Sequence, residues 1–358
     1  MTRKELLHNS LAQWPERNPV ILLAGTFWTG SMEHGLSTGF RRQGWIVREI
    51  EKRDFFSSSS TLLERALNRL SARSRAERYE RAVIEACRHL QPKVLFTVKG
   101  AFLSRRVFEA AREMDIKTVC FWPDRDFDHS GVDLEGLLAS DLFITSKSFQ
   151  MPWLAERGLA ARSAFVAHGY DPDAHMPILR NVTENDYTAD IRYIGNHSPA
   201  KQCWVEGLNG ALPDVNLRVI GNRWSSNLPR PLSQRLVEAA SYHAANYALA
   251  IQTARINIAV HWGKAPNGWE DHVSTRTFEI PACGGFMLHI DNDEVRQYYD
   301  VGTEIDVFSD VDELADKCRY YLKHDETRRR MARKAHERCV PAYSYHSRAL
   351  EIGRMLRS

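Results

Sequence analysis

One segment, Ser274–Leu288 (STRTFEIPACGGFML), brings together an arginine, a carboxylate and a Gly-Gly pair. Arg276 and Glu279 stand three residues apart there, so on a helix their side chains lie on the same side. A guanidinium presents a planar fork of donors to a diphosphate, and a carboxylate accepts hydrogen bonds from sugar or ribose hydroxyls. A helix N-terminus adds unpaired N–H groups and a partial positive charge. The spacing fits an ordinary Arg–Glu pair on a buried helix equally well, so both interpretations stay open.

Two glycine-containing turns carry groups that could hold the diphosphate of such a ligand. One follows a strand predicted at Ile191–Ile194, and the other follows a strand predicted at Leu217–Ile220. Glycine lets a phosphate approach the backbone closely, and a lysine in the helix after the first turn would offset its charge. Each turn is also typical of a plain strand-to-helix connection with a solvated lysine. The candidate ligand-binding residues of these turns are Gly195, Asn196, Lys201, Gly221, Asn222 and Arg223.

Two carboxylates in the first half of the chain are candidate catalytic residues. Asp124 stands just past a strand predicted at Lys117–Trp122, and ligands of open parallel sheets bind beyond the carboxyl ends of the strands. A carboxylate there could remove the proton of an attacking hydroxyl. Glu33 follows the loop after the first predicted strand, where it would either orient a substrate or belong to a solvated helix start.

No metal site is predicted. Asp124-x-Asp126 and Asp291-x-Asp293 both spell D-x-D, a motif that holds a metal and a diphosphate in another fold, but three-residue matches are common by chance. The six cysteines include no C-x-x-C pair, so a zinc site is not expected.

Composition bounds the class of protein. The chain has 358 residues, of which 43% are apolar and 26% charged, and this is typical of a globular protein with two domains. The formal net charge of +3 neither demands nor excludes a polyanionic partner. The first residues contain no apolar signal sequence, and no apolar run approaches the ~18 residues of a membrane span. We therefore expect a cytoplasmic protein without a transmembrane segment.

The elements that must position these residues alternate along the chain. Short β-branched runs take turns with helical patterns, which predicts an α/β fold with doubly wound parallel sheets. In the first half the predicted strands are Val20–Ala24, Trp45–Ile50, Val94–Val98, Lys117–Trp122, Leu142–Thr145 and Ala164–Ala167. In the second half they are Ile191–Ile194, Leu217–Ile220, Ile256–Val260 and Phe286–Ile290.

The alternation also suggests the domain boundaries. It stops at residues 171–190, which contain two prolines and little periodicity, and it then restarts. We assign residues 1–172 to a first domain, 173–189 to a linker and 190–340 to a second domain. Residues 341–358 are expected to form a C-terminal helix that packs back on the first domain.

A set of motifs in the second half is similar to a known family. Arg276-x-x-Glu279 is followed by Ala282-Cys283-Gly284-Gly285, and the chain ends near Tyr345-His346-Ser347-Arg348. These motifs, over roughly residues 190–350, resemble the GT-B glycosyltransferases of the CgeB-like, spore-maturation group. The resemblance implies two facing Rossmann-like domains with an interdomain cleft, and a nucleotide-sugar donor held by the second domain.

The resemblance adds residues to the predicted site. Asp271 stands eight residues before Glu279, similar to the acidic-x7-Glu pair of many retaining GT-B enzymes, with Asp in place of the usual first Glu. His168, in His168-Gly169-Tyr170-Asp171-Pro172, resembles a donor-contacting hinge residue, although a structural histidine fits the same pattern. The run Trp122-Pro123-Asp124 resembles an aromatic-x-Asp element of the phage DNA β-glucosyltransferase, which implies that Asp124 is the general base.

The function implied is transfer of a hexosyl or pentosyl group from a nucleotide-diphosphate sugar, with a UDP-sugar favoured, no cofactor required and no metal expected. The acceptor stays open between a saccharide, a protein and a hydroxymethylated base of DNA. Basic residues within 64–88 and 328–334 would contact nucleic acid or an anionic membrane surface, or form solvated helical faces. The alternatives are a nucleotide-sugar 2-epimerase of the same fold and a non-catalytic sugar-nucleotide-binding protein.

Overall fold

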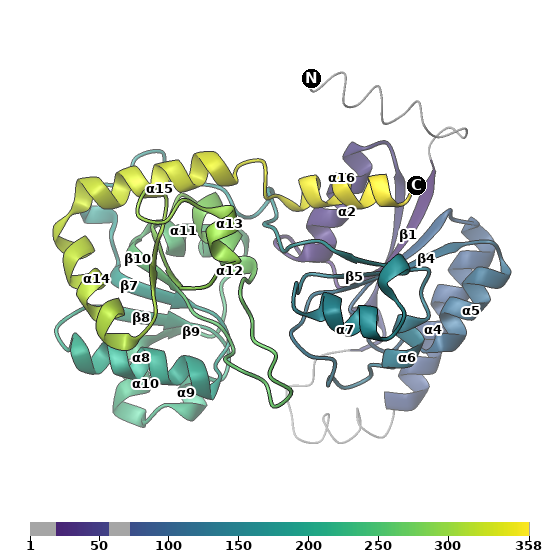
Figure 1. Cartoon of the computed structure of the whole chain (residues 1–358), viewed down its shortest axis with the longest axis horizontal. Coiled ribbons are helices and arrows are strands. Elements are labelled where there is room, and N and C mark those ends of the chain that lie inside the picture. Colours follow the sequence, from purple (N-terminus) through teal and green to yellow (C-terminus); the bar gives the residue numbers. More distant parts are fainter. Residues whose placement is uncertain (1–18, 57–71, 358) are drawn as a thin grey trace. The chain divides into compact units, whose positions relative to one another are not determined.

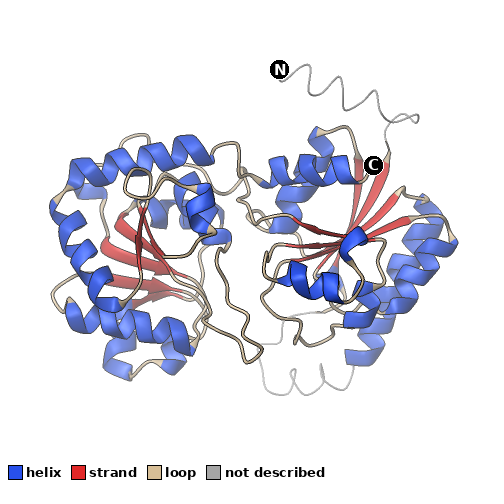
Figure 2. Ribbon diagram, in the orientation of Figure 1, coloured by secondary structure: helices blue, strands red, loops and turns tan. Residues whose placement is uncertain are grey.

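The chain forms two α/β units, each built on a sheet of parallel strands (Figure 1). The computed structural model describes residues 19–56 and 72–357. Unit 1 contains the described residues up to Ala167 together with residues 346–357, and unit 2 contains His168–Tyr345. Each unit is built on one six-stranded sheet that helices cover (Figure 2). The predicted class of two doubly wound, Rossmann-like sheets is confirmed.

Unit 1 has the strand order β2-β1-β3-β4-β5-β6, with every pair parallel. Its strands are β1 Val20–Gly25, β2 Ile46–Glu51, β3 Val94–Val98, β4 Lys117–Trp122, β5 Leu142–Thr145 and β6 Ser163–Phe165. Its helices are α2 Met32–Arg42, α4 Ala72–Leu90, α5 Arg105–Glu113, α6 Leu134–Leu138, α7 Gln150–Glu156 and α16 Tyr345–Met355. Short 3-10 turns occupy η1 Lys52–Asp54 and η2 Ala160–Arg162. Each strand predicted for this half is present; β3, β4 and β5 have the predicted bounds, and the ends of β1, β2 and β6 differ by one or two residues.

Unit 2 has the strand order β12-β11-β10-β7-β8-β9, again all parallel. Its strands are β7 Ala189–Ile194, β8 Leu217–Ile220, β9 Val237–Ala239, β10 Ala254–Ala259, β11 Met287–Ile290 and β12 Asp306–Phe308. Its helices are α8 Pro199–Ala211, α9 Trp224–Asn227, α10 Arg230–Leu236, α11 Ala244–Gln252, α12 Thr275–Ala282, α13 Val295–Tyr298, α14 Val311–Lys323 and α15 Asp325–Cys339, with η3 Glu184–Asp186. The two edge strands β9 and β12 were not predicted, because three residues show no periodicity. No helix in residues 19–56 and 72–357 is long and apolar enough to cross a membrane.

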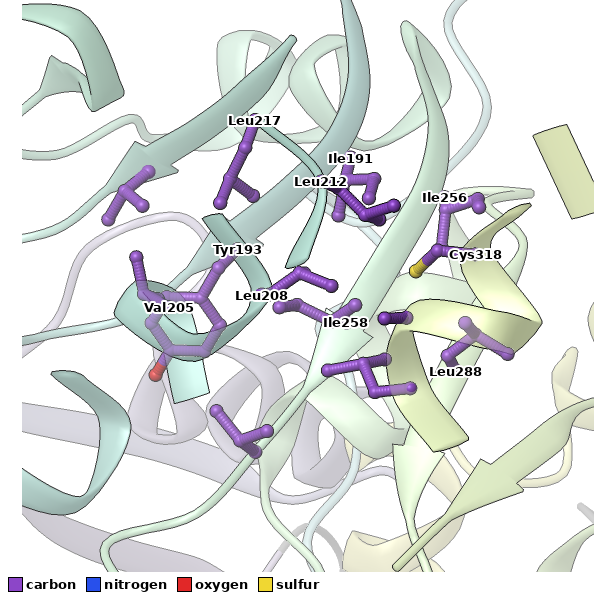
Figure 3. Close-up of a cluster of buried hydrophobic side chains, with 14 of the residues drawn as sticks. Ile191, Tyr193, Val205, Leu208, Leu212, Leu217, Ile256, Ile258, Leu288 and Cys318 are labelled. Carbon is purple, nitrogen blue, oxygen red and sulfur yellow. The ribbon is translucent and has the colours of Figure 1, made fainter. Parts of the chain in front are cut away.

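The strand sequences explain why both faces of each sheet are covered. In unit 1, β3 reads VLFTV and all of its residues are buried, as parallel strands between two helical layers require. In unit 2, β-branched and leucine side chains of β7, β8 and β10 pack against α8 and α14 in one core (Figure 3). Burying each such side chain contributes roughly 1.5–3 kcal/mol, so this packing is a main source of the stability of unit 2.

Residues 173–189 and helix α16 each group with one of the two units. Residues 173–189, predicted as the linker, group with unit 2, where the backbone N–H groups of Ile178 and Leu179 donate to Gln252 Oε1 at 2.7 and 2.9 Å. Helix α16 groups with unit 1, where the His346 ring lies 2.9 Å from Thr38 Oγ1 of α2. Unit 2 therefore begins at His168.

Candidate functional site

The two glycine-containing turns of unit 2 lie directly against each other. The turn after β7 and the turn after β8 are neighbours because β7 pairs with β8 in parallel. The His197 N–H donates to the Asn222 carbonyl at 3.0 Å, and the Asn222 N–H donates to Asn196 Oδ1 at 3.1 Å. The structure thus brings the predicted residues of both turns together at the carboxyl edge of the sheet.

Gly221 has no room for a side chain. Its φ of +157° lies in the region that favours glycine, and a Cβ atom there would stand 2.0 Å from the carbonyl oxygen of Gly195. The contact is backbone against backbone, so no side-chain rotation relieves it. Glycine is therefore required for the two turns to meet.

We expect Gly221→Ala to destabilise unit 2 by about 3 kcal/mol, because the Cβ overlap forces the two turns apart. Gly210→Ala is the matched control. Gly210 lies in α8, and a Cβ atom added there would meet nothing within 4 Å, so this change should stabilise by about 1 kcal/mol. Urea unfolding of both variants measures the difference. Equal stability of the two variants would contradict the close approach.

Helix α12 places Arg276 beside the first turn. The helix starts at a capping box, in which the Ser274 N–H donates to Thr277 Oγ1 at 3.1 Å. A Cβ on Gly195 would lie 3.1 Å from the Arg276 guanidinium, which stands 5.9 Å from the centre of the Tyr193 ring. Burial lowers the pKa of Arg276, but the nearby Tyr193, Tyr247, Glu279 and Asp271 raise it more, so the side chain stays charged. Within the described residues Arg276 Nε is buried without a hydrogen-bond partner.

An orphaned buried donor of a charged group costs free energy unless a ligand completes it. Arg276 Nε is such a donor, and it stands beside a turn whose glycine leaves the backbone accessible. This favours the ligand-binding interpretation of the Arg276–Glu279 spacing over the buried ion pair, because the structure shows no ion pair between the two side chains within its described part.

Two side chains that the sequence did not indicate face the Glu279 carboxylate, and one of them binds it directly. The Tyr247 hydroxyl donates to Glu279 Oε2 at 2.5 Å, and His175 Nε2 lies 3.8 Å from Oε1. Burial first, and then the Glu279 carboxylate, raise the pKa of Tyr247 well above its usual value, so its hydroxyl remains a donor. His175 Nδ1 accepts the Asp171 N–H at 3.0 Å, which leaves the ring proton on Nε2, facing Glu279.

The remaining predicted residues of unit 2 divide into buried and exposed ones. Lys201 is 1% exposed, donates from Nζ to the Asn196 carbonyl at 3.1 Å and lies 4.0 Å from the centre of the Trp262 ring. The alternative of a solvated lysine is therefore wrong. His168 and Asp271 are also buried. Asn222 and Arg223 are exposed, and Arg223 starts α9 with a left-handed φ of +69°.

Beneath α12, His289 makes unit 2 sensitive to acid. Burial lowers the pKa of His289 from 6.5 to about 4, and the ring lies 2.9 Å from Thr277 Oγ1 and 2.6 Å from the Ile290 carbonyl. Between these pH values the unfolded chain binds a proton that the folded chain does not. The free energy of unfolding should therefore fall by about 3 kcal/mol as the pH drops from 6.5 to below 4.

Urea unfolding between pH 7 and pH 4 measures this loss. The variant His289→Gln keeps a hydrogen-bonding side chain but cannot take up the proton, so its stability should fall less over the same interval. A slope equal to that of the unchanged chain would show that another group is responsible.

In unit 1 the two predicted catalytic carboxylates lie at the same edge of the sheet. Asp124 follows β4, and its Oδ2 lies 2.8 Å from Lys99 Nζ and 3.6 Å from His129 Nε2. Glu33 lies in the first turn of α2, where its Oε1 accepts the Thr26 N–H at 3.4 Å. Burial raises the pKa of Glu33, and the ammonium groups of Lys99 and Lys52 partly offset it. Lys99 thus pairs with Asp124 and also acts electrostatically on Glu33.

Lys99 and Lys52 are candidate site residues that the sequence interpretation missed. Lys99 comes directly after β3, and Lys52 comes directly after β2. Burial lowers the pKa of Lys52, while Glu33 raises it and Lys99 lowers it. The signal that could have found both lysines is the one that selected Asp124, namely a position at the carboxyl end of a predicted parallel strand.

Comparison with solved structures identifies the class of fold. Sucrose-phosphate synthase from Thermosynechococcus elongatus matches with a TM-score of 0.67 at 12% identity, over 95% of this chain and 98% of that chain. HepE from Anabaena, solved in complex with UDP-glucose, matches with a TM-score of 0.59 at 11% identity, over 94% of this chain and 99% of that chain. The chain therefore has the GT-B fold of glycosyltransferases.

A protein-family model matches most of the second half of the chain. Residues 201–353, which include Arg276 and Glu279, match the family described as glycosyl transferase-like. A protein described as a UDP-N-acetylglucosamine 2-epimerase from Listeria monocytogenes also matches, with a TM-score of 0.56 at 9% identity, over 94% of this chain and 95% of that chain. A search of curated proteins finds no significant match. The fold by itself is thus compatible with transfer and with epimerisation.

Proposed function

We propose that the chain transfers a sugar from a nucleotide-diphosphate donor, a UDP-sugar in particular, to a hydroxyl acceptor. The observation that carries the proposal is the Arg276 guanidinium, which stands beside Gly195 and whose buried Nε–H has no hydrogen-bond partner among the described residues. The glycosyl transferase-like match over residues 201–353 and the UDP-glucose complex of HepE support the same donor class.

In this proposal unit 2 holds the donor. The diphosphate lies against the turns at Gly195 and Gly221, where Arg276 and the buried Lys201 offset its charge. Glu279 accepts hydrogen bonds from ribose or sugar hydroxyls. Tyr247 and His175 face its two carboxylate oxygens and orient them. Asn196, Asn222 and Arg223 supply further polar groups around the nucleotide, and Asp271 and His168 complete the predicted set.

The proposed reaction assigns proton removal to unit 1. The acceptor oxygen attacks the anomeric carbon, the bond from that carbon to the diphosphate oxygen breaks, and the acceptor proton passes to the Asp124 carboxylate. The electron pair leaves with the nucleoside diphosphate, whose negative charge Arg276 and Lys201 stabilise. Glu33 orients the acceptor. In this proposal Arg276 and Lys201 supply the positive charge at the leaving group, so the reaction is proposed to run without a metal. Inversion is expected if Asp124 is the base.

The experiment that tests the proposal follows the donor and its products. The chain is incubated with UDP-glucose, with and without a panel of saccharide, protein and hydroxymethylated DNA acceptors, and both UDP and glycosylated product are measured. Transfer predicts equal amounts of UDP and product, and only with an acceptor. Isomerised donor without an acceptor would instead show epimerisation, which the Listeria match makes a specific alternative. Binding of UDP without any release would show a non-catalytic protein.

A DNA acceptor would require phosphate contacts. The basic helix predicted at residues 64–88 lies within the described residues only from Ala72, in α4, where Arg73 pairs with Glu77 at 3.2 Å. If this helix contacts the DNA backbone, transfer to hydroxymethylated duplex should fall steeply between 50 and 200 mM salt, by about tenfold for every few phosphate contacts. Transfer to a neutral saccharide that is insensitive to salt would favour the saccharide acceptor.

A further inference from the structure

A pocket of about 350 Å³ lies in unit 2, away from the predicted donor turns. Its lining includes Ala254, the first residue of β10, and Phe286, the residue before β11. It therefore opens at the amino edge of the sheet, whereas the donor turns follow the carboxyl ends of the strands. Neither Arg276 nor Glu279 lines it. A pocket of this size can take a small organic ligand.

Arginine dominates the charge of this pocket. Five arginines line it, and they come from the segment before β7, from β10 and from α15: Arg180, Arg255, Arg328, Arg329 and Arg333. The acidic side chains paired with them are Glu184, Asp190 and Asp325. Five positive and three negative charges leave a net charge of +2.

The ion pairs hold three of the arginines around one aromatic ring. Arg255 stands 4.4 Å from the centre of the Tyr187 ring, and Arg328 and Arg329 each stand 5.6 Å from it. Arg255 pairs with Glu184 at 2.6 Å, and Arg329 pairs with Asp325 at 2.6 Å. These ion pairs fix the three guanidinium groups on one side of the pocket.

The other two arginines are available to an anion. Arg180 and Arg333 line the pocket and are exposed, and neither makes an ion pair in the part of the chain that the structure describes. Next to them the lining is apolar, with Pro177, Leu179 and Phe286. The same pocket therefore combines a net positive charge with an apolar wall.

We propose that this pocket binds a small organic anion in which a phosphate group is joined to an apolar or aromatic part. Arg180 and Arg333 contact the phosphate, and the ring lies against Leu179 and Phe286. Phosphate suits this site because guanidinium forks bind it with two parallel hydrogen bonds. The site is independent of the proposed sugar transfer and does not require that the chain be a transferase.

The test uses phenyl phosphate as the probe, titrated calorimetrically into the full chain, with and without saturating UDP. We expect one phenyl phosphate per chain, bound equally well in both conditions, because the pocket is separate from the donor turns. Inorganic phosphate should bind at least tenfold more weakly, since it cannot contact the apolar wall. Absence of binding, or loss of binding in UDP, would overturn the assignment.

Two double variants locate the site. Arg180→Gln with Arg333→Gln should weaken phenyl phosphate binding at least tenfold, because each charge-assisted hydrogen bond contributes strongly to affinity. The control is Arg330→Gln with Lys334→Gln, which changes exposed cations of α15 outside the pocket by the same net charge. The control should stay within twofold of the unchanged chain. An equal loss in both double variants, or no loss in the first, would show that the pocket is not the binding site.

Discussion

Replacing Arg276 by glutamine should weaken UDP binding by about 100-fold and leave the stability of the free chain unchanged or slightly higher. The loss follows because charge-assisted hydrogen bonds to phosphate are worth about 1.5–3 kcal/mol each, and a guanidinium can make two of them. The stability does not fall, because the variant removes a charged group whose buried Nε finds no partner in the described residues. Calorimetric titration with UDP and thermal unfolding without ligand measure the two effects.

The matched control for this prediction is Arg296→Gln. Arg296 is an exposed arginine of α13 that pairs with Asp291 at 2.7 Å, so its removal changes the same net charge in the same unit. UDP affinity should stay within twofold. If Arg276→Gln binds UDP as well as this control does, the guanidinium is not part of the donor site. If it unfolds the chain instead, Arg276 has a structural role.

The second large effect concerns Asp124. We expect Asp124→Asn to slow sugar transfer by about 10²–10⁴-fold, because an amide cannot accept the acceptor proton. UDP affinity should not change, since the proposal places the donor contacts in unit 2. The initial rate of product formation, measured with the acceptor that the transfer panel identifies, gives the first number, and calorimetry gives the second.

Asp126→Asn is the control for Asp124. Asp126 also lies after β4, is similarly half-buried and pairs with Arg125 at 2.9 Å, so it shares the local charge but is not the predicted base. Its transfer rate should stay within a fewfold of the unchanged chain. Equal losses in both variants would mean that the segment is only structural. A normal rate in Asp124→Asn would remove this residue from the mechanism.

Much of the fold was predictable because parallel strands buried on both faces leave a strong pattern. β3, β4 and β8 coincide with the predicted strands, since each is a short run dominated by apolar and β-branched residues. The edge strands β9 and β12 were not predicted, because they are short and pair on one side only.

The site was predictable only where the chemistry lies in one continuous segment. Arg276 and Glu279 share a helix, so their spacing could be read directly. His175 and Tyr247 hold Glu279 from segments far away in the chain, and no local pattern links them to it. Lys99 and Lys52 come to the same sheet edge as Glu33 and Asp124 only through the strand order β2-β1-β3-β4, which periodicity does not encode.

The most direct test of the donor site is a crystal structure of the chain with bound UDP-glucose. The account predicts the diphosphate against the Gly195 turn, within hydrogen-bonding distance of Arg276 Nε and Lys201 Nζ, and a ribose or sugar hydroxyl on the Glu279 carboxylate. Nucleotide bound elsewhere in unit 2, with Arg276 and Glu279 making no contact to it, would contradict the account.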